Sequence, residues 1–179
     1  MEANMAYADV LELHRSAPRR SERTEKSSAE RNPAPMTAAA SMLAYLGAAP
    51  LLAAALTIVA RPEYAPPAQG FLVLYGAALV IFFAGVRWGV AVMKPKGPTM
   101  GGLVGAAAPF LAALPLIAPG PAEVKIAAIM VLIALLLIDD LRATRSGDGA
   151  PAWYLGVRIP LTVLIEVSFL VALAAGARG

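Results

Sequence analysis

The stretch GFLVLYGAALVIFFAGVRWGVAVM, residues 70–93, decides the fold class of this chain. It contains a single charged residue, Arg87, in an otherwise largely apolar run. Because a helix rises about 1.5 Å per residue, roughly 20 apolar residues cross the hydrocarbon core of a bilayer. The stretch is long enough for one crossing, and we expect a transmembrane helix.

The whole chain has the composition of a membrane protein with several crossings. Of its 179 residues, 59% are hydrophobic and only 15% are charged, which is too little charge to cover the surface of a soluble domain. The apolar residues form five blocks, and open sheet edges cannot face lipid. We therefore predict an all-α bundle of five transmembrane helices. The predicted spans are residues 37–60, 70–93, 101–118, 121–138 and 153–175.

Residues 1–36 differ from the rest of the chain. They are rich in serine and charged residues, and few of them suit a core, so we predict a disordered polar tail. Met36 is a second candidate for the true first residue, in which case the tail is an artefact of the chosen start. The predicted organisation is a tail of residues 1–36 followed by a transmembrane domain of residues 37–179.

Lysine and arginine residues predict the orientation. In the five-span arrangement, twelve of the fifteen lie on one side and only Arg61, Lys125 and Arg178 lie on the other. Positive residues are retained in the cytoplasm, so we expect a cytoplasmic amino terminus and a periplasmic carboxyl terminus. Without the tail the asymmetry still stands at six to three.

Aromatic and small residues mark the cytoplasmic end of the predicted spans. Three aromatic residues are expected at headgroup level as interfacial anchors: Trp88, Trp153 and Tyr154. Two glycine pairs at four-residue spacing provide grooves for close helix contact: Gly85 with Gly89, and Gly101 with Gly105. The short link MKPKGPT makes the second and third spans antiparallel neighbours, so we expect these glycines to pack the two helices together or to support self-association.

Several kinds of chemistry are excluded by residue type. The chain has no cysteine, and its one histidine, His14, lies in the tail. Disulfides, thiolate nucleophiles, Cys/His zinc sites and histidine acid–base catalysis in the membrane domain are therefore excluded. The basic residues are spread among tails and loops, so the pI of 9.4 does not indicate nucleic-acid binding. We expect no cofactor, no metal and no enzymatic activity.

Arg87 allows two interpretations. Its guanidinium stays charged in a protein, and its Cα is expected about 9 Å inside the cytoplasmic end of the span. From that depth an arginine side chain can snorkel to lipid phosphates. The alternative is an inward-facing arginine that binds an anion or a carboxylate.

Glu166 lies too deep in the last span for its short side chain to reach an interface. It must face the bundle, either protonated or paired, as a packed structural carboxyl or as part of a proton or cation relay. Its expected depth differs from that of Arg87 by about 4–5 Å. We therefore predict that Arg87 and Glu166 form an intramembrane pair.

A run of charged residues, DDLRATRSGDGAP, follows the fourth predicted span. Adjacent aspartates such as Asp139 and Asp140 occur in metal–diphosphate sites of membrane transferases, where several carboxylates hold Mg²⁺. Here no further carboxylate follows at helical spacing, and Arg142 and Arg145 supply counter-charge. We expect a solvated interfacial turn.

Two motifs carry a family resemblance: FFAGVRWG (Phe82–Gly89) and PAWYLGVRIPLT (Pro151–Thr162). With YLGAAP (Tyr45–Pro50) and the order of spans, they resemble a family of small bacterial inner-membrane proteins of unknown function. That family includes an animal mitochondrial relative called transmembrane protein sixty-nine. The resemblance implies a location, the bacterial inner membrane, but no activity.

The functional expectation is an integral inner-membrane protein with a non-enzymatic structural, assembly or interaction role. Its expected partners are the lipid bilayer and either a second copy or another membrane protein. A small transporter or proton-coupled carrier using Glu166 and Arg87 is the first alternative. A membrane transferase using Asp139 and Asp140 is the second.

Overall fold

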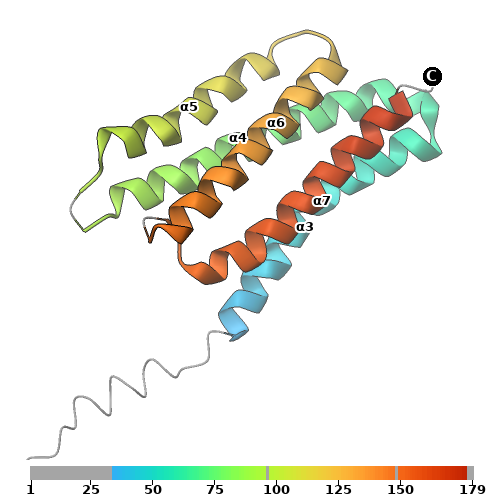
Figure 1. The fold of residues 1–179 in the computed structure, drawn as a ribbon. Helices are drawn as coiled ribbons and strands as arrows, with labels where there is room; N and C mark the ends of the chain where they lie inside the picture. The colour runs from blue at the N-terminus through green and yellow to red at the C-terminus, as the bar shows by residue number, and fades with distance from the viewer. Residues whose placement is uncertain (1–33, 96, 148, 177–179) are drawn as a thin grey trace, which may run out of the picture. The chain divides into compact units, whose positions relative to one another are not determined.

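The described residues of the computed structural model, 34–95, 97–147 and 149–176, fold into α-helices without a β-strand, as predicted (Figure 1). The elements are α3 (Ala34–Ala60), the 3-10 helix η1 (Pro62–Tyr64), α4 (Ala65–Val92), α5 (Met100–Ile117), α6 (Ala122–Arg145) and α7 (Ala152–Gly176). The chain divides into two compact units, Met1–Ala38 and Ala39–Gly179, and the helices pack within the second. Apart from its last three residues, which begin α3, the predicted tail lies outside the described residues.

Four described helical segments are long and apolar enough to cross a membrane. They are Ala38–Ala60, Pro62–Val92, Met100–Ile117 and Trp153–Gly176. Large apolar side chains such as Leu56, Leu111 and Val163 are more than half exposed on these helices, as contact with lipid requires. The chain is therefore a multi-pass membrane protein by length and composition.

The fourth predicted span corresponds to α6, which is not among these four helices. Instead of ending at Ile138, α6 continues through its charged residues to Arg145. It ends where Ser146 caps it and Gly147 takes a positive φ of 78°, the left-handed conformation that glycine adopts after a helix. The expectation of a solvated turn at Asp139 and Asp140 was wrong, because both residues lie within the helix.

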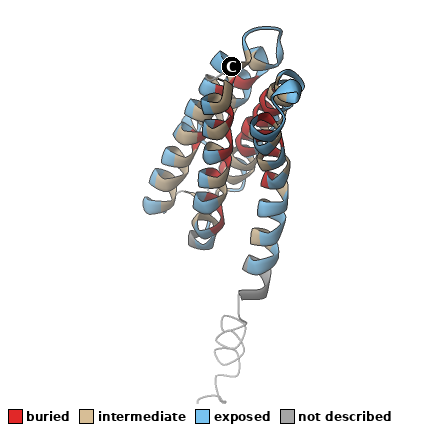
Figure 2. Cartoon of the chain, turned by 90° about the vertical axis from the view of Figure 1, so that its right-hand side faces the viewer, coloured by how far each residue is buried: buried red, intermediate tan, exposed pale blue. Residues whose placement is uncertain are grey.

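Helices α4 and α6 occupy the centre of the second unit. Helix α4 packs against α5, α6 and α7, and α6 also packs against α5 and α7. In Figure 2, the buried positions gather where the helices face one another. Helix α6 buries four apolar residues at helical spacing: Ile126, Ile129, Ile133 and Leu136. Helix α5 is peripheral and buries only Ala106 and Ala113.

Helices α4, α6 and α7 approach one another closely at Gly76 of α4. A Cβ atom built there would lie 2.6 Å from Cζ of Phe169 on α7 and 3.0 Å from Cγ2 of Ile129 on α6. One residue earlier, the Tyr75 hydroxyl donates a 2.6 Å hydrogen bond to the Gly47 carbonyl of α3. The middle of α4 therefore contacts three other helices within two residues.

The predicted glycine pairs lie near the contact between α4 and α5 but do not make it. A Cβ atom at Gly85, Gly89 or Gly101 would meet nothing within 4 Å, and one at Gly105 would lie 3.7 Å from Nη2 of Arg87. The glycine that faces α4 closely is Gly102, where a Cβ atom would lie 3.6 Å from the Ala91 Cβ. The two helices are packed antiparallel as expected (Figure 1).

Candidate functional site

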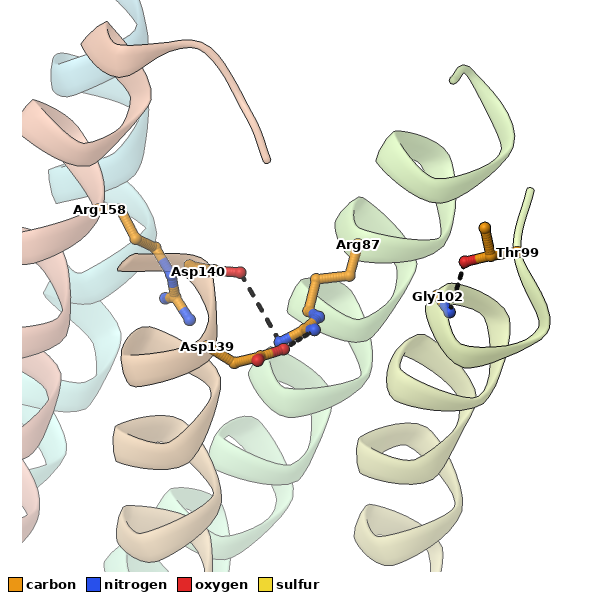
Figure 3. Close-up of polar contacts among 6 residues, drawn as sticks. All are labelled: Arg87, Thr99, Gly102, Asp139, Asp140 and Arg158. Atoms are coloured by element: carbon orange, nitrogen blue, oxygen red, sulfur yellow. Dashed lines mark hydrogen bonds and ion pairs between the residues drawn. The ribbon is translucent and has the colours of Figure 1, made fainter. Parts of the chain in front are cut away.

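Four charged side chains from three helices meet near one end of the bundle (Figure 3). We call them the aspartate–arginine cluster: Arg87 of α4, Asp139 and Asp140 of α6, and Arg158 of α7. Two arginines and two aspartates balance each other in formal charge. The extension of α6 beyond Ile138 brings both carboxylates to the level of the arginines.

Asp140 is the centre of the cluster because it contacts both arginines. Arg158 Nε donates a 3.2 Å hydrogen bond to Oδ2 of Asp140, and Arg87 Nη1 lies 3.9 Å from Oδ1. The Asp140 side chain is only 11% exposed. In this largely dry position a carboxylate needs such partners, since an unpaired buried charge is costly.

Arg87 faces into the bundle. Its Nη2 donates a hydrogen bond to Oδ2 of Asp139, and its side chain is 19% exposed. Asp139 is about half exposed. Of the two interpretations of Arg87, the geometry is that of the inward-facing arginine bound to carboxylates, and not that of an arginine snorkelling to lipid.

Arg158 is the most deeply buried member, with 1% of its surface exposed. Its guanidinium carbon lies 3.4 Å from the centroid of the Phe83 ring, a cation–π arrangement that favours a desolvated cation. Its Nη1 and Nη2 atoms are buried and have no hydrogen-bond partner among the described residues. The Asp140 contact therefore satisfies only part of this guanidinium.

Glu166 does not belong to the cluster. Among the described residues, no ion pair joins it to Arg87, whose carboxylate partners are Asp139 and Asp140 instead. The Oε1 atom of Glu166 and the Oγ1 atom of Thr162 are both buried without a hydrogen-bond partner in the described part of the chain. With Arg158, these residues follow at four-residue spacing along α7, which places them close to one face of that helix.

A cavity of about 330 Å³ lies beside the cluster. Its lining includes Arg87, Asp139, Asp140, Lys94 and Tyr154. The first turn of α5 also contributes, and there the Thr99 hydroxyl accepts a 3.2 Å hydrogen bond from the Gly102 amide (Figure 3). The polar wall of this cavity is therefore largely occupied by groups that already bind one another.

The aromatic residues predicted as anchors lie at the same end as the cluster. Trp88 is 46% and Trp153 is 50% exposed, whereas Tyr154 is partly buried and lines the cavity. Their anchoring role stays a prediction. Tyr154 differs from the two tryptophans because its side chain lies partly inside the bundle, where it lines the cavity beside the cluster.

The aspartates are bound differently from what the sequence indicated. Arg142 and Arg145, the expected counter-charges, are exposed, and the carboxylates pair with Arg87 and Arg158 instead. In the ranges that the structure describes, no group of three or more His, Cys, Asp or Glu side chains is placed to hold a metal ion. Asp148 lies outside the described residues.

Comparison with known protein families gives a match over most of the chain. The model of a family described as a protein of unknown function, DUF3429, matches residues 36–174. The chain belongs to the DUF3429 family. This confirms the resemblance to a family of unknown function that the two motifs suggested. No curated protein and no solved structure matches the chain.

Both motifs lie within the range matched to DUF3429, and the fold brings their arginines together. Arg87 belongs to FFAGVRWG and Arg158 to PAWYLGVRIPLT, and both contact Asp140. Phe83, which stacks on Arg158, also comes from the first motif. Arg158 was not among the site residues predicted from the sequence, although it lies within one of the two motifs. The signal for a site was its position within an apolar helix, which is also what singled out Arg87.

Proposed function

We propose that this DUF3429 protein is a non-enzymatic protein of the bacterial inner membrane that acts by interaction, as a structural or assembly partner of another membrane protein or of a second copy. The observation that carries this proposal is the aspartate–arginine cluster. Its four charges bind one another and hold α4, α6 and α7 together. Charged groups committed to one another in this way stabilise a scaffold and are poorly available for catalysis.

We further propose that α6 is a fifth crossing. Its apolar stretch is short, but α4 and α7 pack against it, and its four buried residues face the core. Its aspartates contact Arg87 and Arg158, so they need not face lipid. A helix enclosed in this way crosses a membrane at lower hydropathy than a lipid-exposed one.

With five crossings the amino terminus is cytoplasmic and the carboxyl terminus periplasmic. This orientation is supported by the twelve-to-three distribution of lysine and arginine. The end of the bundle that carries the cluster then faces the cytoplasm, together with the exposed residues Arg142 and Arg145.

Reporter fusions on either side of α6 test the fifth crossing. Alkaline phosphatase, which is active only in the periplasm, is expected to be active when fused after Gly120 and inactive when fused after Arg145. A fusion after Ala175 serves as the control and is expected to be active. Equal activity after Gly120 and Arg145 would show that α6 does not cross, and would reject the five-span arrangement.

Photo-crosslinking in intact membranes tests the interaction role. A photoreactive amino acid at Leu46, Leu111 or Leu170, which are all more than half exposed on different helices, is expected to give a discrete protein adduct from at least one helix. Ile133, fully buried, is the matched control and is expected to give none. Mass spectrometry then separates a second copy from a different protein. The absence of protein adducts at all three exposed positions contradicts an interaction role.

The carrier alternative is favoured by one observation: the buried Thr162 Oγ1 and Glu166 Oε1 atoms on α7 have no hydrogen-bond partner in the part of the chain that the structure describes. A carrier predicts proton uptake into liposomes that contain the purified protein, and loss of that uptake in Glu166→Gln. Ser168→Ala is the control, because the Ser168 hydroxyl on the same helix already donates a 2.8 Å hydrogen bond to the Leu164 carbonyl. Proton uptake that depends on Glu166 would replace the interaction role as the proposed function.

A further inference from the structure

A second cavity, of about 430 Å³, lies between α3, α4 and α7. We call it the α3–α7 groove. Its lining is almost entirely apolar and includes Leu43, Leu79, Phe82, Val157, Leu161 and Ile165. Leu43 and Phe82 are each more than 60% exposed, so the groove opens toward the surface that faces lipid. An apolar cavity of this kind suits a hydrocarbon chain.

One lining residue of the α3–α7 groove is charged, and it is Arg158. Its Nε atom donates a hydrogen bond to Asp140, but Nη1 and Nη2 have no hydrogen-bond partner among the described residues. Leaving the donors of a buried cation unsatisfied is expensive. The two terminal nitrogens of a guanidinium form a fork that matches two oxygens of a phosphate or carboxylate.

The Cα of Arg158 lies near the end of α7 that carries the aspartate–arginine cluster. Its Cα lies six residues after the start of α7 at Ala152, which is about 9 Å along the helix. The Arg158 side chain runs away from the start of α7 toward Asp140 and the Phe83 ring, so a phosphate reaches its guanidinium only by entering the groove below the level of the Cα (Figure 3). Trp153, half exposed on the first turn of α7, also lines the groove at the level expected for an interfacial aromatic residue.

We propose that the α3–α7 groove binds one anionic phospholipid. An acyl chain lies along the apolar lining, and the phosphodiester oxygens accept hydrogen bonds from Nη1 and Nη2 of Arg158. Asp140 still accepts the hydrogen bond from Nε, and the Phe83 ring still stacks against one face of the guanidinium. Since the two nitrogens are closed off from solvent, the phosphate reaches them only when a lining side chain changes its rotamer. Exchange of the lipid is therefore slow, and the lipid remains bound during purification.

Native mass spectrometry of the full chain tests this proposal. Protein purified in detergent is stripped of bound lipid and then incubated, long enough for slow entry, with dioleoyl-phosphatidylglycerol or with dioleoyl-phosphatidylcholine at equal concentration. One phosphatidylglycerol is expected to stay bound, with about tenfold weaker retention of phosphatidylcholine, because only the former brings net negative charge to the guanidinium. Inorganic phosphate is the third arm and is expected neither to bind nor to raise the Tm, which separates a lipid site from a free-anion site.

Two variants probe the two halves of the site. Ala44→Phe fills the groove and leaves the cluster intact, whereas Leu46→Phe adds the same ring on α3 at a residue outside the lining. We expect about a tenfold loss of phosphatidylglycerol retention in Ala44→Phe and none in Leu46→Phe. Arg158→Lys keeps the charge but lacks the fork, so it is expected to retain both lipids more weakly while still preferring phosphatidylglycerol.

Three outcomes would overturn the proposal. They are equal retention of the two lipids by the unchanged protein, unchanged retention in Ala44→Phe, and binding of inorganic phosphate alone. Ala44→Phe keeps the test decisive even if Arg158→Lys does not fold. The result is independent of the proposed interaction role, because the groove can bind lipid whether or not the protein has a protein partner.

Discussion

Asp140→Leu is expected to lower the free energy of unfolding in detergent by about 3–5 kcal/mol, the usual cost of removing one partner of a buried charge pair. The change leaves Arg158 buried at 1% exposure without the carboxylate to which it donates a hydrogen bond, and it removes the second carboxylate from Arg87. Chemical or thermal unfolding of the purified protein measures the effect.

The double variant Asp140→Leu with Arg158→Leu is expected to be more stable than Asp140→Leu alone, because it no longer buries an unpaired cation. The matched control is Asp139→Asn, the neighbouring carboxylate, which is about half exposed. Its loss is expected to cost less than that of Asp140, because Asp139 is about half exposed and Arg87 keeps Asp140 as a second carboxylate. Additive effects of Asp140→Leu and Arg158→Leu would contradict a cluster centred on Asp140.

Gly76→Leu is expected to prevent or severely weaken the packing of α4 against α6 and α7. Even the Cβ atom would come within 2.6 Å of the Phe169 ring, and both Phe169 and Ile129 are fully buried, so neither has space to retreat. Overpacking of this kind typically costs about 1–3 kcal/mol, and a leucine adds three more carbon atoms beyond the clash. The expected readouts are a reduced Tm and reduced yield from membranes.

Two further variants check that the effect of Gly76→Leu is steric. Gly85→Leu adds the same side chain to the same helix, but a Cβ atom there meets nothing within 4 Å, so its Tm is expected to stay unchanged or to rise. Combining the milder Gly76→Ala with Phe169→Leu is expected to recover part of the stability that Gly76→Ala loses. If Gly85→Leu is as damaging as Gly76→Leu, then α4 is oriented differently from the structure.

The positions of the helices were largely predictable because apolar blocks of membrane length allow only one secondary structure. The ends of α3, α5 and α7 fall within a few residues of the predicted ones. Helix α6 was predicted too short because its charged residues indicated a loop. The better signal was Ser146–Gly147, where a glycine with positive φ ends the helix.

The partner of Arg87 was not predictable from depth alone. Counting residues placed Arg87 and Glu166 at similar depths, but depth does not say which helix faces which. In the structure α6 packs against α4 and carries two carboxylates at the required level, so Arg87 pairs there. The glycine spacing had the same weakness. Four-residue spacing puts Gly85 and Gly89 on one face of α4, yet it does not say what that face contacts, and a Cβ atom at either glycine would meet nothing within 4 Å.

The position of Asp140 in the chain has a consequence for biogenesis. Arg87 is synthesised 52 residues before Asp139, whereas Arg158 follows Asp140 by 18 residues. When α6 leaves the ribosome, one arginine is therefore already available in the membrane and the other has not yet been made. Aspartate is among the residues least readily inserted into a bilayer. We therefore expect α6 to insert while Arg87 of α4 is already available to pair with its aspartates, and to be fully charge-paired only after α7 brings Arg158. A chain that stops before α7 is expected to leave α6 only half neutralised, and so to be the form that a membrane quality-control protease removes.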